Sequence, residues 1–147
     1  MTGDNDFAKT VAKGMYAQDN AAQALGIRIE EMRPHYALAR MIVRDDMLNS
    51  HGVCHGGIIF TLADTAFAYA SNSENKATLA VSCNINFAAA VPAGAELTAV
   101  AEKKSRGGRT GIYDVTVTDG AGKTVALFRG NSYQVRGESV PGLGDGN

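Results

Sequence analysis

The chain has 147 residues, of which 45% are hydrophobic and 20% are charged, and this composition suits one compact domain with a sizeable core. The formal net charge of −1 provides no overall field that would attract nucleic acid or an anionic membrane. No apolar run approaches the roughly 20 residues of a membrane span, and the acidic N-terminus lacks the regions of a signal peptide. We therefore expect a cytoplasmic protein whose two cysteines are reduced.

The N-terminal part predicts one helix and then two strands. Residues 5–24 carry apolar side chains four residues apart, at Phe7, Val11 and Met15, which is the spacing of a helix, and Asp19 is a candidate cap for a second short turn. Two apolar, partly alternating runs follow at residues 27–30 and 38–43, and Arg33-Pro34-His35 between them is a turn signal.

Residues from about 56 to 73 predict a long helix that has almost no polar face. Such a helix must be buried on all sides, and in one small domain only a curved sheet can enclose it. The remaining sequence supplies strands: residues 79–87 alternate strictly, and three further strands begin near Leu97, Tyr113 and Val125. This order indicates an α+β fold in which an antiparallel sheet wraps around one helix.

The domain is expected to comprise residues 1–136. Residues 137–147 are rich in glycine and predict a flexible C-terminal tail.

A glycine-rich loop leads into the long helix. Gly56 and Gly57 at a helix start leave backbone N–H groups bare where the helix dipole is positive, and such a site polarises a carbonyl group. Asp64 lies inside the same helix, where a charged side chain is seldom buried unpaired. Thr61 or Thr65 could satisfy this carboxylate. The alternative that we favour is that Asp64 is a base or a nucleophile, and hence that the protein carries out carbonyl chemistry.

The spacing between these groups has a consequence for assembly. Gly56 and Asp64 are eight residues apart, about 12 Å along one helix, and an aspartate side chain recovers only roughly 2–3 Å of that. One carbonyl therefore cannot contact both groups of the same helix. If both act on one substrate, they belong to two antiparallel helices of an obligate dimer with two equivalent sites.

Metal binding by the cysteines and histidines, or a cysteine nucleophile, is a weaker hypothesis than carbonyl chemistry at Asp64 and Gly56. His51, Cys54 and His55 are close in sequence, but their spacing matches no common zinc or haem pattern. Cys54 as a nucleophile would need a base, and its neighbour His55 is badly placed to be one. Cys83 is interpreted as a small buried residue.

Two polar segments have either a structural or a functional interpretation. Residues 106–110, Arg-Gly-Gly-Arg-Thr, form a basic turn that is either a solvated hairpin or a contact for phosphate groups. Ser82 shares one face of its strand with Asn84 and Asn86, and the pattern alone predicts that this face is wet.

Taken together, several segments resemble the hotdog-fold acyl-CoA thioesterases of the PaaI (phenylacetyl-CoA thioesterase) type. The resemblance covers residues 15–135. It is carried by Asn49, the His55-Gly56-Gly57 loop, the helical residues 60–70 with Asp64, and residues 110–115 and 125–130. The combination of His-Gly-Gly with an aspartate seven residues after the second glycine is its most specific part.

The resemblance implies a five- or six-stranded antiparallel sheet around one long helix, and dimers that pair edge to edge, usually into tetramers. It also implies roles for individual residues. Asp64 attacks the thioester or activates water, Gly56 of the other subunit polarises the carbonyl, Asn49 and Ser82 orient the water or the carboxylate, and His55 lies beside the carbonyl or the sulfur. By the same resemblance, the substrate is contacted by Gly57, Thr65, Arg106, Gly108, Arg109 and Thr110.

The expected reaction is hydrolysis of phenylacetyl-CoA or a ring-modified relative, without a metal or other cofactor, and with no nucleic-acid or membrane partner. Medium-chain acyl-CoA is the alternative substrate. A dehydratase or hydratase of 3-hydroxyacyl thioesters and a non-catalytic acyl-CoA-binding protein are the alternative functions.

Overall fold

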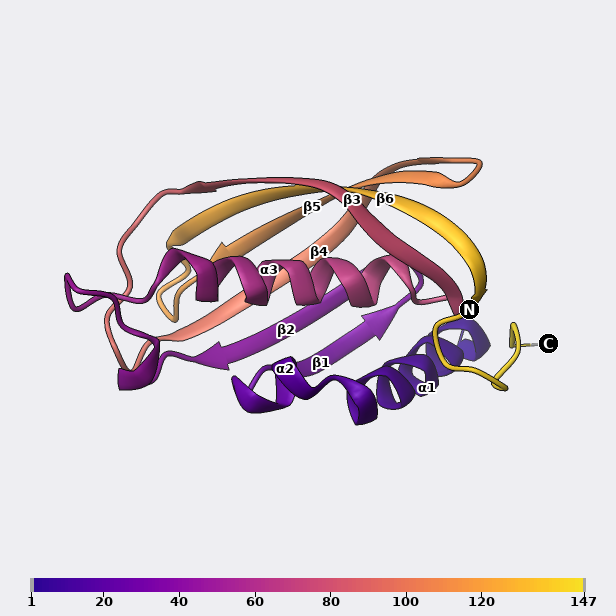
Figure 1. Ribbon diagram of the computed structural model, residues 1–147, viewed down its shortest axis with the longest axis horizontal. Coiled ribbons are helices and arrows are strands. Elements are labelled where there is room, and N and C mark those ends of the chain that lie inside the picture. Colours follow the sequence, from indigo (N-terminus) through magenta and orange to yellow (C-terminus); the bar gives the residue numbers. More distant parts are fainter. Residues whose placement is uncertain (1, 147) are drawn as a thin grey trace.

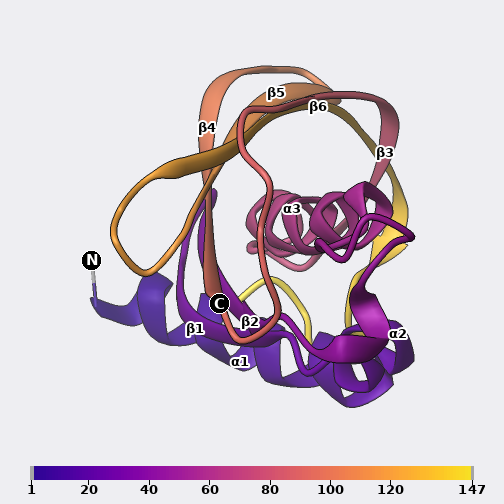
Figure 2. The ribbon, with the colours of Figure 1, turned by 90° about the vertical axis from the view of Figure 1, so that its left-hand side faces the viewer.

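A single six-stranded antiparallel sheet curls around the helix α3 (Gly56–Ser71), as Figures 1 and 2 show. The computed structural model describes residues 2–146. The strands lie in the order β1-β2-β4-β5-β6-β3, and their bounds are β1 (Arg28–Arg33), β2 (Tyr36–Ile42), β3 (Lys76–Phe87), β4 (Glu96–Gly107), β5 (Thr110–Thr118) and β6 (Thr124–Glu138). The predicted α+β hotdog architecture is confirmed.

The N-terminal helical region is divided in two. Helices α1 (Thr2–Gln18) and α2 (Asn20–Ala24) meet at Asp19, whose side chain accepts a hydrogen bond from the Ala22 N–H at 3.2 Å. The helix predicted over residues 5–24 is therefore divided at Asp19, and the prediction that Asp19 caps a second short turn is confirmed. Helix α1 lies along β1 at the open side of the curled sheet (Figure 2).

The sheet encloses α3 on most of its circumference, which is why the helix carries so few polar residues. Its fully buried side chains include Leu62, Ala63 and Ala66. One stripe of the helix nevertheless stays partly or fully exposed. Its residues are separated in turn by four and three positions, and they are Gly57, Thr61, Asp64, Ala68 and Ser71. The expectation that α3 is buried on all sides therefore does not hold for this stripe of a single chain.

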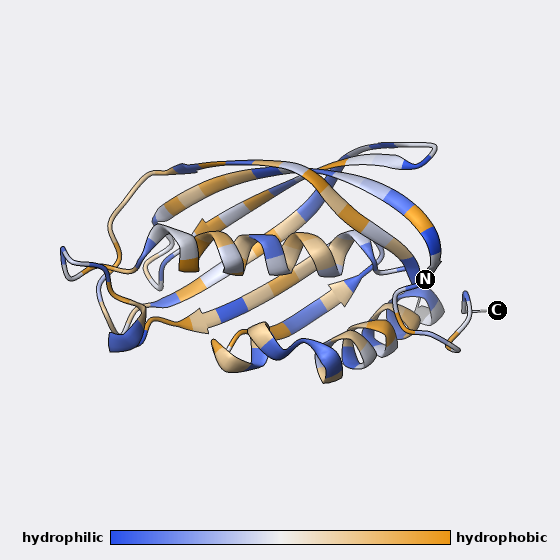
Figure 3. Cartoon of the chain, in the orientation of Figure 1, coloured by the Kyte–Doolittle hydropathy of each residue, from blue (hydrophilic) through white to orange (hydrophobic). Residues whose placement is uncertain are grey.

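In the part of the chain that the structure describes, strand β3 is one edge of the sheet and pairs with β6 alone. A bulge between Ala80 and Ser82 interrupts the alternation that the sequence predicts to be strict. The strand exposes three large apolar side chains, Leu79, Val81 and Phe87, and Figure 3 shows hydrophobic segments along it. The opposite edge, β1, instead carries exposed charges at Arg28, Glu30, Glu31 and Arg33.

The C-terminal residues fold back beside the end of α3. Strand β6 ends at Glu138, two residues beyond the predicted domain boundary. The Asn75 side chain then accepts a hydrogen bond from the Val140 N–H and donates one to the Gly144 carbonyl, both at 2.7 Å. The flexibility predicted for residues 137–147 stays a prediction. Met1 and Asn147, the ends of the predicted domain and tail, lie outside the described residues.

Candidate active site

The N-terminus of α3 presents one free backbone donor. His55 is the N-cap, and its ring nitrogen Nδ1 accepts the Gly57 N–H at 3.2 Å. The His55 carbonyl accepts the Ile58 N–H at 2.9 Å. Within residues 2–146, no acceptor contacts the Gly56 N–H. This N–H is therefore available to an external oxygen, at the positive end of the helix dipole.

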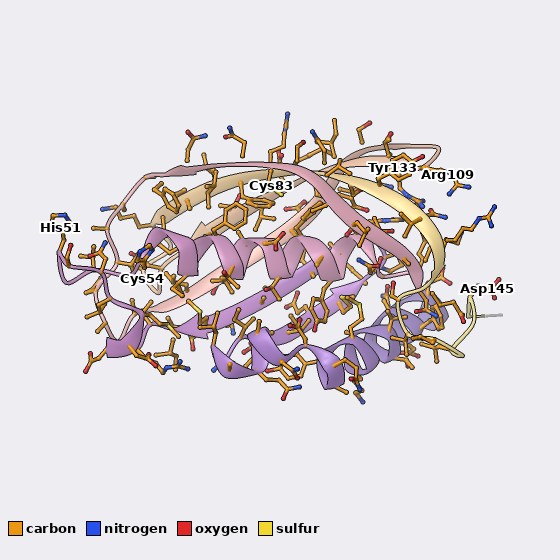
Figure 4. All side chains as sticks on the ribbon, viewed as in Figure 1. His51, Cys54, Cys83, Arg109, Tyr133 and Asp145 are labelled. Atoms are coloured by element: carbon orange, nitrogen blue, oxygen red, sulfur yellow. The ribbon has the colours of Figure 1, made fainter. Side chains whose placement is uncertain are left out.

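Asn49 shapes the loop that leads to this helix. Its side-chain oxygen accepts the His51 N–H at 2.9 Å and the Val53 N–H at 3.4 Å, and its own N–H donates to the Val53 carbonyl at 2.8 Å. These bonds close a tight turn whose tip carries the exposed His51 (Figure 4). In the described part of the chain, no three His, Cys, Asp or Glu side chains are grouped so that they could hold a metal ion.

Asp64 lies half-buried in the middle of α3, and no hydrogen-bond donor or cation contacts its carboxylate in the described residues. The neighbouring hydroxyls do not satisfy it, because Thr61 donates to the Gly57 carbonyl at 2.9 Å and Thr65 donates to the Thr61 carbonyl at 2.6 Å. Burial raises the pKa of Asp64 above its usual value. An unsatisfied carboxylate with increased basicity is suited to accept a proton.

Cys83 is the neighbour of Asp64 that the sequence analysis missed. Its side chain is half-buried on the inner face of β3, and burial followed by the charge of Asp64 raises its pKa. Period-two alternation put Cys83 on an inner face, but the register between strand and helix cannot be read from sequence.

Ser82 lies on the opposite face of β3 from Cys83. It is exposed, and its hydroxyl accepts a hydrogen bond from Asn131 Nδ2 at 2.8 Å. The wet face predicted for Ser82 is confirmed, while its predicted role in orienting water stays a prediction.

Aromatic side chains line the space between α3 and the sheet near Asp64. The ring of Phe128 packs against Phe60 and Phe67, with centroids 5.5 Å and 5.7 Å apart. Phe60 and Phe67 lie four residues before and three residues after Asp64, so all three share one side of the helix. The carboxylate is therefore bordered by an apolar, aromatic layer.

The β4–β5 hairpin lies at the far end of the molecule, where Figure 4 places Arg109 opposite His51. The Arg106 guanidinium donates to Gln134 at 3.1 Å and lies 3.5 Å from the Glu74 carboxylate, which balances its charge. The Arg109 side chain is exposed and, within residues 2–146, donates to the Gln134 carbonyl alone, at 3.3 Å. Of the two arginines predicted to contact substrate, Arg109 is thus the better placed to meet an anion.

The rest of this hairpin has structural roles in the single chain. The Thr110 hydroxyl donates to the Gly107 carbonyl at 3.1 Å, and Gly108 has a φ of 59°, a conformation that glycine adopts without strain. The predicted substrate contacts of Gly108 and Thr110 stay predictions. The structure thus collects Asn49, His55, Gly56 and Gly57 at one end of α3, places Asp64 and Thr65 at its middle, and leaves the hairpin at its other end.

Residues 51–126 match the family model of the thioesterase superfamily, and this range contains the His-Gly-Gly loop and all of α3. The chain belongs to the thioesterase superfamily. It is 48% identical to the acyl-coenzyme A thioesterase PaaI of Escherichia coli, over 86% of this chain and 90% of that protein. A putative esterase of Archaeoglobus fulgidus is 42% identical over 93% of this chain and 89% of its own length.

Solved structures agree with this assignment. The thioesterase superimposes on the E. coli PaaI protein, described as belonging to the phenylacetic acid degradation operon, with a TM-score of 0.90 and 45% identity over 92% of this chain and 98% of that one. A Streptococcus mutans protein crystallised with acetyl CoA gives a TM-score of 0.72 at 26% identity, over 76% of this chain and 90% of that one. The predicted family and enzyme class are confirmed.

In the described residues of this thioesterase, no helix is long and apolar enough to cross a bilayer.

Proposed function

We propose that this thioesterase hydrolyses aryl-acetyl-CoA thioesters to the free acid and CoA, at sites formed between two subunits. The observation that carries the proposal is the pair of unsatisfied groups on α3: the half-buried Asp64 carboxylate and the free N–H of Gly56. A base and an oxyanion donor are the two groups that thioester hydrolysis requires, since a thiolate leaves readily without a strong acid.

Two features of the single chain support the participation of a second copy. Asp64 and Gly56 are about 12 Å apart along α3, too far to act on one carbonyl. The exposed stripe of α3 that contains Asp64 and the apolar, unpaired edge of β3 are surfaces that a second copy would cover. Strand β1, the other edge, is charged and therefore resists the same pairing. A tetramer built from two such dimers follows from the resemblance to PaaI-type enzymes.

The chemistry follows from the two groups. The ionised Asp64 either takes a proton from water, which attacks the carbonyl carbon, or attacks that carbon itself. In both cases the carbonyl oxygen becomes negative and is stabilised by the Gly56 N–H of the partner subunit. The C–S bond then breaks and CoA leaves as a thiolate. When water is the nucleophile, this step gives the free acid directly. When Asp64 is the nucleophile, it leaves an anhydride between Asp64 and the acyl group, which a water molecule hydrolyses to release the acid and restore the carboxylate. Asn49, His55 and Ser82 are assigned the supporting roles that the resemblance implies.

The choice of an aryl-acetyl group rests on two supports. The aromatic layer of Phe60, Phe67 and Phe128 borders Asp64 and suits a flat ring. The E. coli relative is named an acyl-coenzyme A thioesterase, and its structure is described as coming from the phenylacetic acid degradation operon. Medium-chain acyl-CoA is the competing substrate, because a plain apolar core has the same composition.

The test is the release of CoA from a panel of acyl-CoAs, followed with a thiol reagent. We expect turnover of phenylacetyl-CoA by the wild type and a loss of about 10²-fold or more in Asp64→Ala. Wild-type protein that binds the panel tightly but hydrolyses none of it would identify a binding protein instead. Activity only on 3-hydroxyacyl thioesters without CoA release would identify a dehydratase.

A further inference from the structure

Phe87 lies over the N-terminus of α3. A Cβ atom built on Gly56 would lie 3.1 Å from Cζ of the Phe87 ring and 3.4 Å from both Cε atoms. Apart from Gly56, its two chain neighbours and the adjacent backbone of α3, the ring of Phe87 is the nearest group to that point in the described residues. Phe87 is also 52% exposed, which leaves part of the ring open to a ligand. We therefore expect a carbonyl group bound to the Gly56 N–H to lie close to this ring.

The position of Asp64 relative to β3 sets how two chains can meet. Cys83 pairs with Gly130, and a Cβ built on Gly130 would lie 2.7 Å from the ring of Phe67. Phe67 is three residues after Asp64 on α3, so Cys83 marks the level of Asp64 along the strand. Phe87 marks the level of Gly56 in the same way.

These two levels determine a register for pairing of β3 with a second copy. Asp64 meets Gly56 of the partner subunit when Cys83 lies opposite the partner subunit's Phe87. In an antiparallel pair this puts Ile85 on the two-fold axis, with opposite Cβ atoms about 4.5–5.5 Å apart. Cys83, Ile85 and Phe87 alternate onto the same inner face of β3, as this register requires.

We propose that Phe87 is the residue that selects aromatic acyl groups, acting in the site that contains the Asp64 of the partner subunit. This inference rests on the function proposed above and deepens it. The ring borders the carbonyl position, and it shares the inner face of the sheet with Ile85 and Phe128, which pair with each other. The acyl group, not the polar CoA arm, meets this apolar surface. An edge-to-face or offset contact with an aryl ring adds attraction that an aliphatic chain does not gain.

The selectivity test compares Phe87→Leu with Leu127→Ala. Leu127 and Phe87 are about equally exposed, at 51% and 52%, but Leu127 lies on the outer face of the sheet. Leu127→Ala is therefore the control for the loss of an exposed apolar side chain. We expect Phe87→Leu to lower kcat/KM for phenylacetyl-CoA by about 2- to 13-fold, and to leave octanoyl-CoA within about twofold. Leu127→Ala should change neither. An equal fall for both substrates would place Phe87 against the CoA arm, and no change would remove it from the site. Either result overturns the proposal.

The register is tested independently with cysteines on the outer face. Asn84 and Asn86 are exposed, and in the proposed register each lies opposite the other residue of the partner subunit. Under mild oxidation, the double variant Asn84→Cys/Asn86→Cys should form covalent dimers, while each single variant and the wild type should not. Cross-linking of Asn84→Cys alone, or of Asn86→Cys alone, would place that residue opposite its own copy, which is a register shifted by two residues, and would overturn the geometry.

Different outcomes would contradict the proposed function and the assignment of Phe87. If Asp64→Ala retains hydrolysis of every acyl-CoA, the proposed function is wrong. If Asp64→Ala abolishes hydrolysis but Phe87→Leu leaves the aryl preference intact, only the assignment of Phe87 is wrong.

Discussion

Replacement of Gly56 by proline should remove one hydrogen-bond donor from the site and leave the helix able to form. Gly56 is the first residue of α3, where proline is favoured because its fixed φ suits the helix and its missing N–H has no helical acceptor. The preceding residue, His55, is extended with φ −61° and ψ 133°, which is the conformation that proline requires before it.

Gly56→Ala is the matched control for this variant. Both substitutions introduce a Cβ atom 3.1 Å from the Phe87 ring, so the ring must shift slightly in each, but only proline removes the N–H. Loss of one preorganised oxyanion donor costs about 10²–10³ in kcat, or ~2.7–4 kcal/mol. We therefore expect Gly56→Pro to be slower than Gly56→Ala by about that factor.

Steady-state release of CoA from phenylacetyl-CoA measures the effect, and thermal unfolding checks the fold. The two variants should melt within about 4 °C of each other, which corresponds to ~1 kcal/mol in a chain of this size. Equal kcat in the two variants, with both folded, would refute the role of the Gly56 N–H.

Three further predictions concern charge, packing and assembly. Burial raises the pKa of Asp64 above 3.8, so kcat/KM should fall as the pH drops through this raised pKa. In the unfolded chain Asp64 loses its proton at a lower pH than in the folded protein. The wild type should therefore lose stability relative to Asp64→Asn as the pH rises from the ordinary pKa of an aspartate to the raised pKa of Asp64. Parallel curves of Tm against pH for the two proteins would contradict this. Gly130→Ala should cost about 1–3 kcal/mol in urea unfolding, because its Cβ would lie 2.7 Å from the Phe67 ring, whereas Gly107→Ala, with no atom within 4 Å, should cost far less. Val81→Lys adds a charge to the exposed β3 edge and should weaken the dimer in sedimentation analysis; an unchanged dimer would argue against pairing through this edge.

Local patterns in the sequence determined the helices and strands and singled out Asp64. The apolar run after Gly57 predicts α3, the alternation of residues 79–87 predicts β3, and the position of Asp64 in an apolar helix marks it as the exceptional carboxylate. These inferences succeed because helix and strand periodicity depend on residues close together in the chain. The His-Gly-Gly loop added the family, which the comparisons confirm.

Contacts between distant segments could not be obtained this way. The sequence does not show that Cys83 lies at the level of Asp64, that Phe87 covers Gly56, or that Glu74 neutralises Arg106. Each depends on the register of a strand against a helix or on how a loop end folds back, and a slip of one residue would turn every side chain of a strand to the other face. The bulge at residues 80–82 is such a change of register. Periodicity thus determined which residues could face the helix, and only tertiary packing decided which of them lie beside the carboxylate.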